Sequence, residues 1–313
     1  MVRLEKRLFE ATISDDAHLT RVSQHLLSAG GKRYRPLLAV LASEFGSSQD
    51  DRPIEAGVAV ELIHVGSLYH DDVIDEADTR RGAVSANTNW TNTVAILAGD
   101  FLMAKASETA ATSLSNESVR LLAATYAELV EGQMQELQLD FDTEHGLAEY
   151  ETVISRKTAS LIRTSARLGA MAADADDQTV DAITSWAHEV GMVFQLADDV
   201  LDLVSTSEEI GKPAGSDIHE GKFTMPILLA LEGPDADRIR KLLSESRPYP
   251  QASVDEVIDL VRSGGFIDLT LEEAHRRLAV ADEAVTRLPD VAARRVLDGL
   301  GSYLVTRVER SGS

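Results

Sequence analysis

The sequence predicts an all-α protein, and three observations support this. No proline lies within 54–212, so nothing there interrupts a helix by that route, and the segment is rich in Ala, Leu and Glu. Apolar residues recur in it at helical spacing, as in 121–137. Strand-like alternation bounded by Asn-Gly or Asp-Gly is scarce, and the one Asp-Gly pair, 298–299, lies inside a late helical pattern. We expect about ten or more helices, no sheet, and a single domain over 1–313.

Local signals mark where several helices begin. Pro36 follows the segment GGKRYR and fits the first turn of a helix. A Ser-Asn pair precedes Glu117, and the Asp pair 176–177 precedes a long apolar repeat. Ser253, with Glu256 three residues later, has the spacing of a capping box.

Composition excludes several classes of protein. The 313 residues include 30 Lys+Arg and 52 Asp+Glu, a formal net charge of −22, whereas nucleic-acid binders and polybasic membrane-surface proteins need a basic surface. There is no cysteine, which removes disulfides, thiolate metal sites and thiol nucleophiles. The N-terminus lacks the apolar core of a signal peptide, and no apolar stretch reaches the roughly 18 residues of a membrane span. We expect a soluble, cytoplasmic protein.

Two aspartate clusters share the spacing i, i+1, i+4, and each is expected inside an apolar helix. They are Asp71, Asp72 and Asp75 in HDDVIDEADTRRG, and Asp198, Asp199 and Asp202 in FQLADDVLDLV. Helical residues i and i+4 lie one above the other, so the outer two of each cluster can hold the same ion. Carboxylates on an otherwise apolar helix repel one another and resist desolvation unless a cation compensates.

Acid pairs are more often solvated surface, and the Asp pairs at 15–16, 50–51 and 176–177 are interpreted that way, in polar caps or loops. Two clusters with identical spacing in apolar helices favour a functional interpretation instead. Oxygen ligands with no His or Cys among them favour Mg²⁺ over zinc or copper. Magnesium held by a few carboxylates usually completes its shell with water and substrate phosphate, so the pattern predicts a phosphorylated ligand.

Basic residues around these clusters fit an anionic ligand. The glycines of GGKRYRP let the backbone approach a phosphate, and the helix that follows presents its N-terminus to anions. The segment is not a P-loop, because GxxxxGK[ST] is absent. Each of these cations, taken alone, is more typical of an ordinary charged residue on the protein surface than of a ligand-binding residue. The set comprises Lys32, Arg33 and Arg35 after Gly30 and Gly31, then Arg80, Arg81, Lys157, Lys212 and Lys222.

Taken in order, these segments resemble the trans-isoprenyl diphosphate synthases (polyprenyl synthetases), over about residues 25 to 230. The matching segments are GGKRYRP, ELIH, HDDVIDEADTRRG, NTVAILAGDFL, RKTASL, GMVFQLADDVLDL and GKPAGSDIHEGKFTMPIL. The resemblance implies an all-α isoprenoid-synthase bundle around a deep central cavity, with the aspartate motifs facing each other across its mouth. It also implies a homodimer.

The implied reaction is head-to-tail elongation. An allylic diphosphate ionises, isopentenyl diphosphate attacks the allylic cation, and the departing diphosphate takes the proton, so no protein general base is expected. The implied cofactor is Mg²⁺, three ions with substrate diphosphate bound. By resemblance, the residues that hold the metal are Asp71, Asp72, Asp75, Asp198 and Asp202, with Asp199 in a supporting catalytic role.

The resemblance also assigns the substrate contacts. The allylic diphosphate would be bound by Arg80, Lys157, Lys212 and Lys222, of which Lys157 and Lys212 are also counted as catalytic. Isopentenyl diphosphate would be held by Gly31, Lys32, Arg35, His64 and Arg81. Thr158 and Gln195 are expected to stabilise the cation through their oxygen dipoles. Without the family, a lone histidine such as His64 is more often a satisfied core residue.

Two positions bear on product length. In this family, bulky aromatics four and five residues before the first motif stop growth early, and here those positions are Ser67 and Gly66. Tyr69, two residues before the motif, is expected to point to another face. The motif has two residues between its aspartate pairs, as in the long-chain branch. We therefore predict a heptaprenyl or longer product for a quinone side chain, with a transient membrane contact for its release.

Three other functions stay open. A geranylgeranyl or farnesyl diphosphate synthase would share every motif. A non-catalytic subunit of a heteromeric synthase is expected to lose motif aspartates, and all six are present. A cyclising terpene synthase has no second diphosphate to hold, so the set Lys32, Arg35 and His64 argues against it.

Overall fold

The computed structural model describes residues 1–48, 50–204 and 214–311. The chain divides into two compact units, each built from separate stretches of sequence. The first unit holds Met1–Ala127, Leu161–Thr184 and Leu288–Ala293. The second holds Glu128–Ser160, Ser185–Arg287 and Arg294–Ser313. Four helices contribute residues to both units: α8 (Asn116–Leu139), α10 (Ser160–Ala172), α11 (Asp177–Val204) and α18 (Ala292–Ser311). The single-domain organisation stays a prediction.

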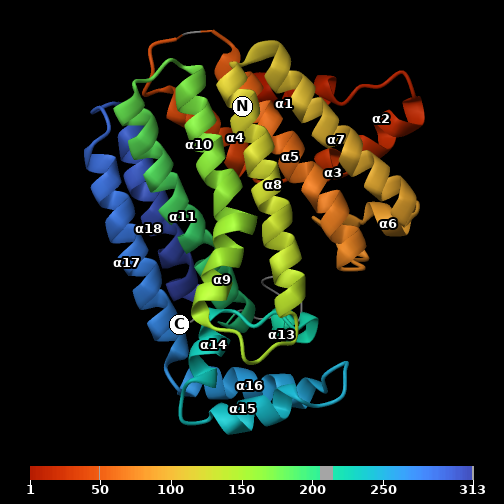
Figure 1. The fold of residues 1–313 in the computed structure, drawn as a ribbon, viewed down its shortest axis with the longest axis vertical. Helices are drawn as coiled ribbons and strands as arrows, with labels where there is room; N and C mark the ends of the chain where they lie inside the picture. Colours follow the sequence, from red (N-terminus) through yellow and green to blue (C-terminus); the bar gives the residue numbers. More distant parts are fainter. Residues whose placement is uncertain (49, 205–213, 312–313) are drawn as a thin grey trace. The chain divides into compact units, whose positions relative to one another are not determined.

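The first unit is helical apart from one short hairpin, and α5 is its central helix, packed against α1, α4 and α7 (Figure 1). Its remaining elements are α1 (Val2–Ala11), α2 (Ala17–Ser23), α3 (His25–Ser28), α4 (Tyr34–Ser43), α5 (Arg52–Ile74), β1 (Thr79–Arg80), β2 (Ala83–Val84), α6 (Ala86–Asn89) and α7 (Asn92–Ser113).

The second unit is helical over the residues that the structure describes, and Trp186 of α11 is buried in its core. Near the end of α11, Ala197, Val200 and Leu201 pack with Val308 of α18. Its remaining elements are α9 (Leu147–Ile154), the π-helix η1 (Ser155–Ala159), α13 (Ser216–Glu220), α14 (Met225–Leu231), α15 (Ala236–Leu243), α16 (Gln251–Ser263) and α17 (Phe266–Thr286). The predicted all-α class is confirmed.

Three predicted helix starts are confirmed and one is wrong. Helix α4 begins at Tyr34, so Pro36 lies in its first turn. Helix α8 begins at Asn116 and α11 at Asp177, where the Asp176 carboxylate accepts the Thr179 N–H at 2.7 Å. The capping box at Ser253 is absent, because α16 already begins at Gln251. Pro250 precedes it with the fixed φ of proline, and the Ser253 hydroxyl, now inside the helix, donates to Glu245 Oε2 at 2.7 Å instead.

The prediction of no sheet is also wrong. Strands β1 and β2 pair antiparallel, with Thr79 opposite Val84. The two turn residues, Arg81 and Gly82, both have positive φ, 55° and 74°, as a type I′ hairpin turn requires. Asn or Asp usually occupies the first of these positions, so the Arg-Gly pair did not signal a hairpin. The hairpin follows α5 directly and carries Arg80 and Arg81.

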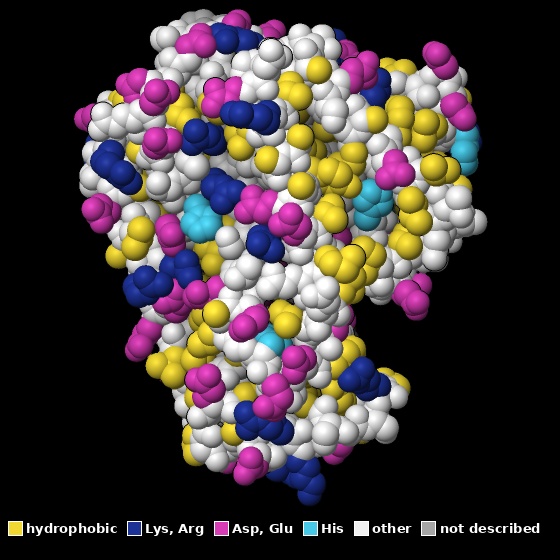
Figure 2. Space-filling view, in the orientation of Figure 1, with side chains coloured by type: hydrophobic (Ala, Val, Ile, Leu, Met, Phe, Trp, Pro, Cys, Tyr) yellow, Lys and Arg dark blue, Asp and Glu magenta, His cyan; other side chains and the backbone are white. Residues whose placement is uncertain are grey.

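The charge excess does not gather on one side of the surface that Figure 2 shows, where acidic and basic side chains are interspersed with apolar ones. Over the residues described, no helix combines the length and the apolar character needed to cross a membrane.

Close helix contacts give a test of the packing in the first unit. A Cβ added at Gly169 of α10 would lie 1.9 Å from the Ala39 carbonyl oxygen of α4. Because that neighbour is backbone, the helices must separate, so Gly169→Ala should lower the free energy of unfolding by about 2 kcal/mol or more. Gly299, in α18, has no such neighbour within 4 Å, and Gly299→Ala should raise stability by up to about 1 kcal/mol. Chemical denaturation of both variants checks this. Equal effects would contradict the packing argument.

Candidate active site

The first aspartate cluster lies at the C-terminal end of α5: Asp71 and Asp72 are inside the helix as predicted, whereas Asp75 is the residue that caps it. Asp71 is half-buried and Asp72 fully buried, whereas Asp75 is exposed and ends the helix with its N–H donating to the Asp71 carbonyl at 2.8 Å. The carbonyls of the last turn make this end of the helix negative, so three carboxylates there need cations even more than mid-helix ones would.

Asp72 is held by an arginine of the hairpin. Arg80 Nε donates to Asp72 Oδ1 at 2.6 Å, while Oδ2, also buried, accepts no hydrogen bond from a described residue. Burial raises the pKa of Asp72, an effect that Arg80 opposes. Asp72 thus has one oxygen committed to Arg80 and one available to another cation.

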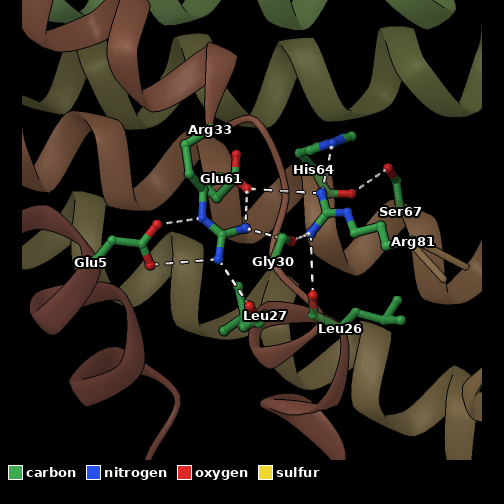
Figure 3. Close-up of polar contacts among 9 residues, drawn as sticks. All are labelled: Glu5, Leu26, Leu27, Gly30, Arg33, Glu61, His64, Ser67 and Arg81. Carbon is green, nitrogen blue, oxygen red and sulfur yellow. Dashed lines mark hydrogen bonds and ion pairs between the residues drawn. The ribbon is translucent and has the colours of Figure 1, made fainter. Parts of the chain in front are cut away.

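Arg81 joins the hairpin to the glycine-rich loop (Figure 3). Its Nη1 donates to the carbonyl oxygens of Gly30 at 2.6 Å and Leu26 at 3.2 Å. Gly31, with a φ of 141°, lies so close that a Cβ would be 2.9 Å from Arg81 Cζ. Glycine is therefore required at position 31 both by the backbone conformation and by the guanidinium packed on it.

The other cations of the loop differ in exposure. Lys32 is exposed. Arg35 is half-buried, and its Nε has no hydrogen-bond partner among the described residues. Burial lowers the pKa of Arg35 and of Arg81, and the nearby carboxylate of Glu61 opposes this in both. The structure therefore gathers two of the predicted isopentenyl diphosphate ligands around one buried acid.

His64 lies on α5 within reach of the same guanidinium. Arg81 Nη2 is 3.4 Å from His64 Nε2. Burial lowers the pKa of His64 well below its usual value, and Arg35, Arg81, Arg33 and Arg80 lower it further. An arginine N–H can only donate, so Nε2 is the acceptor and the imidazole is neutral.

The second aspartate cluster occupies the last two turns of α11. Asp198 is exposed, Asp202 half-buried and Asp199 buried. Asp199 accepts hydrogen bonds from the Tyr150 hydroxyl and, at 2.8 Å, from Gln195 Nε2. Burial raises the pKa of Asp199 to about 7, although both hydrogen bonds oppose the shift.

These contacts continue to the π-helix that follows α9. Thr158 Oγ1 donates to Gln195 Oε1 at 2.8 Å, so Thr158, Gln195, Asp199 and Tyr150 form one hydrogen-bonded chain. Lys157, the preceding residue, pairs with Glu136 of α8. Short π-helical segments are frequent at functional sites, and this one carries two of the predicted catalytic residues.

Gly132 allows α8 to approach this segment. A Cβ at Gly132 would lie 2.8 Å from Arg156 Cβ and 2.9 Å from the Lys157 nitrogen. Neither Gly132 nor Glu136 was identified from the sequence, because nothing local shows which helix α8 contacts.

Asp217 of α13 is a further acid that sequence reasoning missed. Its N–H donates to Asp202 Oδ2 at 3.3 Å, and the Gly215 N–H donates to the Asp202 carbonyl at 3.0 Å. Burial raises the pKa of Asp217 well above its usual value, and Asp202 and Asp199 add to the shift. The acid stands in the quoted segment GKPAGSDIHEGKF, where only the lysines drew attention.

Of those lysines, Lys212 lies outside the described residues. Lys222 follows α13 and pairs with Glu220 at 2.7 Å. It is preceded by Gly221, with a φ of 81°, whose carbonyl accepts the Phe141 N–H at 2.8 Å. A Cβ at Gly221 would lie 2.5 Å from the Phe141 ring, so this loop is fixed by close packing.

Within the described part of the chain, no three His, Asp or Glu side chains converge closely enough to hold a metal ion by themselves. The two aspartate clusters belong to different units, and their predicted facing arrangement stays a prediction.

The neutral state of His64 gives a test of its environment. Its pKa is lower in the folded than in the unfolded chain, so unfolding takes up a proton as the pH falls below about 6.5. Stability should therefore be full above pH 7 and fall below it, by up to about 1.4 kcal/mol per pH unit from this group. Urea denaturation from pH 7.5 to 5 should show a flatter profile for His64→Gln. Parallel profiles would mean that His64 protonates freely in the folded chain.

Comparison with known proteins gives a consistent result. The polyprenyl synthetase family model matches residues 16–261. Nonaprenyl diphosphate synthase of Mycobacterium tuberculosis is 43% identical over 286 residues, 90% of this chain and 85% of that protein. Heptaprenyl diphosphate synthase component 2 of Geobacillus stearothermophilus is 36% identical over 308 residues, 98% and 95% of the two chains.

Among solved structures, geranylgeranyl pyrophosphate synthase of Corynebacterium glutamicum, complexed with calcium and isoprenyl diphosphate, superposes with a TM-score of 0.87. It is 38% identical, and the match covers 98% of this chain and 95% of that one. The fold, the ordered motifs and the extent of these matches agree, so the chain belongs to the polyprenyl synthetase family and is a prenyltransferase.

Proposed function

We propose that this prenyltransferase adds isopentenyl diphosphate units head-to-tail to an allylic diphosphate and makes a long-chain all-trans polyprenyl diphosphate for a quinone side chain. One observation carries the proposal: two aspartate clusters of identical spacing end two buried helices, and the first lies beside a cluster of guanidinium groups. The nonaprenyl and heptaprenyl synthases among its relatives support the long product.

The donor set fits a hard divalent cation. All the candidate ligands are carboxylate oxygens, and Asp72 Oδ2 is buried without a hydrogen bond from a described residue. Bound Mg²⁺ would neutralise the charge that builds up on the departing diphosphate. From the family resemblance, we propose that three ions bind together with the substrate, whose oxygens complete their shells. The ligands we assign are Asp71, Asp72, Asp75, Asp198 and Asp202.

The chain's own residues have separate tasks at the allylic end. Arg80, Lys157, Lys222 and Lys212 would bind the allylic diphosphate, Arg80 while also paired with Asp72. The Thr158 hydroxyl commits its proton to Gln195, so its remaining lone pairs are acceptors that can face a developing carbocation. Gln195 is held at both ends, by Thr158 and Asp199, and its amide orientation is therefore fixed.

At the other substrate, Lys32, Arg35 and Arg81 would hold the diphosphate of isopentenyl diphosphate, and Gly31 lets the Arg81 guanidinium pack closely against the loop. Neutral His64 adds no charge, and it can donate through Nδ1 while Nε2 accepts from Arg81. The positive charge at this site therefore comes from Lys32 and from the guanidinium groups of Arg35 and Arg81.

We propose that the enzyme is a cytoplasmic homodimer. Ile96 and Leu97 of α7 are exposed large apolar residues on one helix, which a second copy could cover. One relative is named as component 2 of its synthase, which favours a heteromeric assembly as the alternative. Light scattering of the purified chain, with an activity assay on the same fraction, separates the two. An active dimer supports the homodimer, and activity that needs a second protein supports the alternative.

Product length depends on α5 next to the first motif. Gly66 faces α7, where a Cβ would lie 2.9 Å from Met103 Cε and 3.1 Å from the Gly99 carbonyl oxygen. Its small size thus serves helix packing. Ser67 is half-buried, its hydroxyl bonded to the His64 carbonyl at 2.9 Å, and is the position of the two that can accept a larger side chain. The 38% identical geranylgeranyl synthase favours a shorter product as the second candidate, which chromatography of the products distinguishes.

Loss of one carboxylate should lower turnover and not the folding of the chain. Asp71→Asn and Asp198→Asn should each reduce kcat by about 10²-fold or more, because charge stabilisation of the leaving diphosphate is lost. Chelation of divalent cations should abolish turnover of the parent enzyme. Steady-state assays with isopentenyl and farnesyl diphosphates measure both effects, with Asp15→Asn in an exposed loop as control. Undiminished kcat in either variant would refute the assignment.

A bulky side chain at position 67 should shorten the product. We expect Ser67→Phe to keep turnover but to stop elongation before the length that the parent enzyme reaches, because the ring blocks the growing chain. Thin-layer chromatography of labelled products measures this, and Ser67→Ala is the matched control. Unchanged length in Ser67→Phe would show that position 67 does not line the path of the chain.

A further inference from the structure

Arg33 lies between Lys32 and Arg35 in the sequence, and its side chain points toward Glu5, Glu61 and Leu27 (Figure 3). It is 7% exposed and stands in the left-handed region, with a φ of 49°. That conformation is rare for a side-chain-bearing residue and persists only where the surroundings hold it. The guanidinium donates to four groups: Glu5 Oε1 at 2.6 Å, Glu61 Oε1 at 3.1 Å, the Leu27 carbonyl at 2.9 Å and the Gly30 carbonyl at 3.2 Å.

Glu61 is the acid at the centre of this arrangement. Its carboxylate is 1% exposed, and besides Arg33 it lies 4.0 Å from Arg81 Nη2. Burial raises the pKa of Glu61, and Arg33, Arg35 and Arg81 oppose the shift. Three guanidinium groups this close repel one another, so a single buried carboxylate offsets the repulsion that gathering them creates.

The two arginines grip the same backbone. Arg33 and Arg81 both donate to the Gly30 carbonyl, and their further acceptors, on Leu27 and Leu26, are adjacent in α3. The loop from 30 to 33, the hairpin residue Arg81 and helix α5 are thereby held together around Glu61.

We propose that Arg33 and Glu61 are positioning residues for isopentenyl diphosphate. They form a buried ion pair that touches no substrate and holds Lys32, Arg35 and Arg81 in the arrangement that binds the diphosphate. This inference rests on the proposed function for its choice of ligand. It predicts an effect on one substrate only, because the pair contacts the glycine-rich loop and Arg81 and, among the residues described, no group at the second aspartate cluster.

The chain offers a matched control. Arg7 of α1 and Glu55 of α5 form an ion pair at 2.8 Å, with Glu55 14% exposed. It joins the same two helices as the contact from Glu5 through Arg33 to Glu61, but it involves neither the loop nor Arg81. Glu55→Gln therefore measures what loss of an α1–α5 ion pair does by itself.

The experiment compares Glu61→Gln, the double variant Arg33→Gln/Glu61→Gln, and Glu55→Gln in the full-length enzyme. In Glu61→Gln and the double variant, we expect the KM for isopentenyl diphosphate to rise by about 10- to 100-fold, as small displacements of binding groups typically cause. The KM for the allylic diphosphate should stay within about twofold in both, and Glu55→Gln should change neither value. The double variant removes both charges of the Arg33–Glu61 pair and so does not leave Arg33 buried without Glu61, which keeps the test valid if Glu61→Gln folds poorly.

Equal increases in both KM values, or an equal effect of Glu55→Gln, would overturn the proposal, since either outcome indicates a general loss of structure. Calorimetric titration with isopentenyl diphosphate alone separates this inference from the proposed function. If the parent protein binds it, and the double variant binds it about tenfold more weakly or worse, the positioning role stands even where no turnover occurs. Equal affinities, or no binding to the parent protein, would refute it.

Discussion

Charge buried at helix ends is the constraint on which the rest of this structure depends. The clusters at the ends of α5 and α11 each place a buried aspartate, Asp72 and Asp199, where peptide carbonyls already make the potential negative. Each needs a donor from a separate segment: Arg80 of the hairpin for one, Tyr150 of α9 for the other. At the end of α11, Arg262 of α16 also donates to the Leu203 carbonyl. The elements around the two helix ends are therefore held in place by hydrogen bonds to buried charges and carbonyls as well as by packing.

The same constraint, with the opposite sign, governs the glycine-rich loop. Arg33, Arg35 and Arg81 lie near one buried acid, Glu61, and the two glycines that precede Lys32 in the loop, Gly30 and Gly31, adopt positive φ angles. A diphosphate bound at Lys32, Arg35 and Arg81 would reduce the remaining repulsion between these positive side chains, which favours tight binding. Arg33 has no such freedom, because its donors are already satisfied inside the protein.

The sequence predicted what local pattern encodes. Helical periodicity, the start of α8 at Asn116 and that of α11 at Asp177 are confirmed, and the ordered set of motifs identified the family. Prediction from the sequence failed where the local conformation depends on residues far along the chain. The hairpin turn at Arg81 has no Asn or Asp, and its strained conformation is held by carbonyls of α3 and the loop after it.

The partners of the site residues were hidden for the same reason. Three motif residues contact a residue of another element: Asp199 contacts Tyr150, Lys157 contacts Glu136, and Asp202 contacts Asp217. Nothing in the sequence around these three partners identifies them as site residues. Arg33 was visible inside GGKRYRP but was grouped with the ligand-facing cations, because sequence alone does not show which way a loop side chain points.

These contacts also explain how a chain with a net negative charge can bind anionic substrates. The net charge of −22 is a property of the whole, whereas a substrate responds to charges within roughly 10 Å, since salt screens the rest. At the glycine-rich loop, the guanidinium groups of Arg33, Arg35 and Arg81 are opposed by Glu61 and Glu5. Both of those acids accept hydrogen bonds from Arg33, and Glu61 also offsets part of the charge of Arg35 and Arg81. Sequestering the acids on one inward-facing arginine is thus what keeps the neighbouring cations available, and a loop with the same composition but an outward Arg33 would lose that advantage.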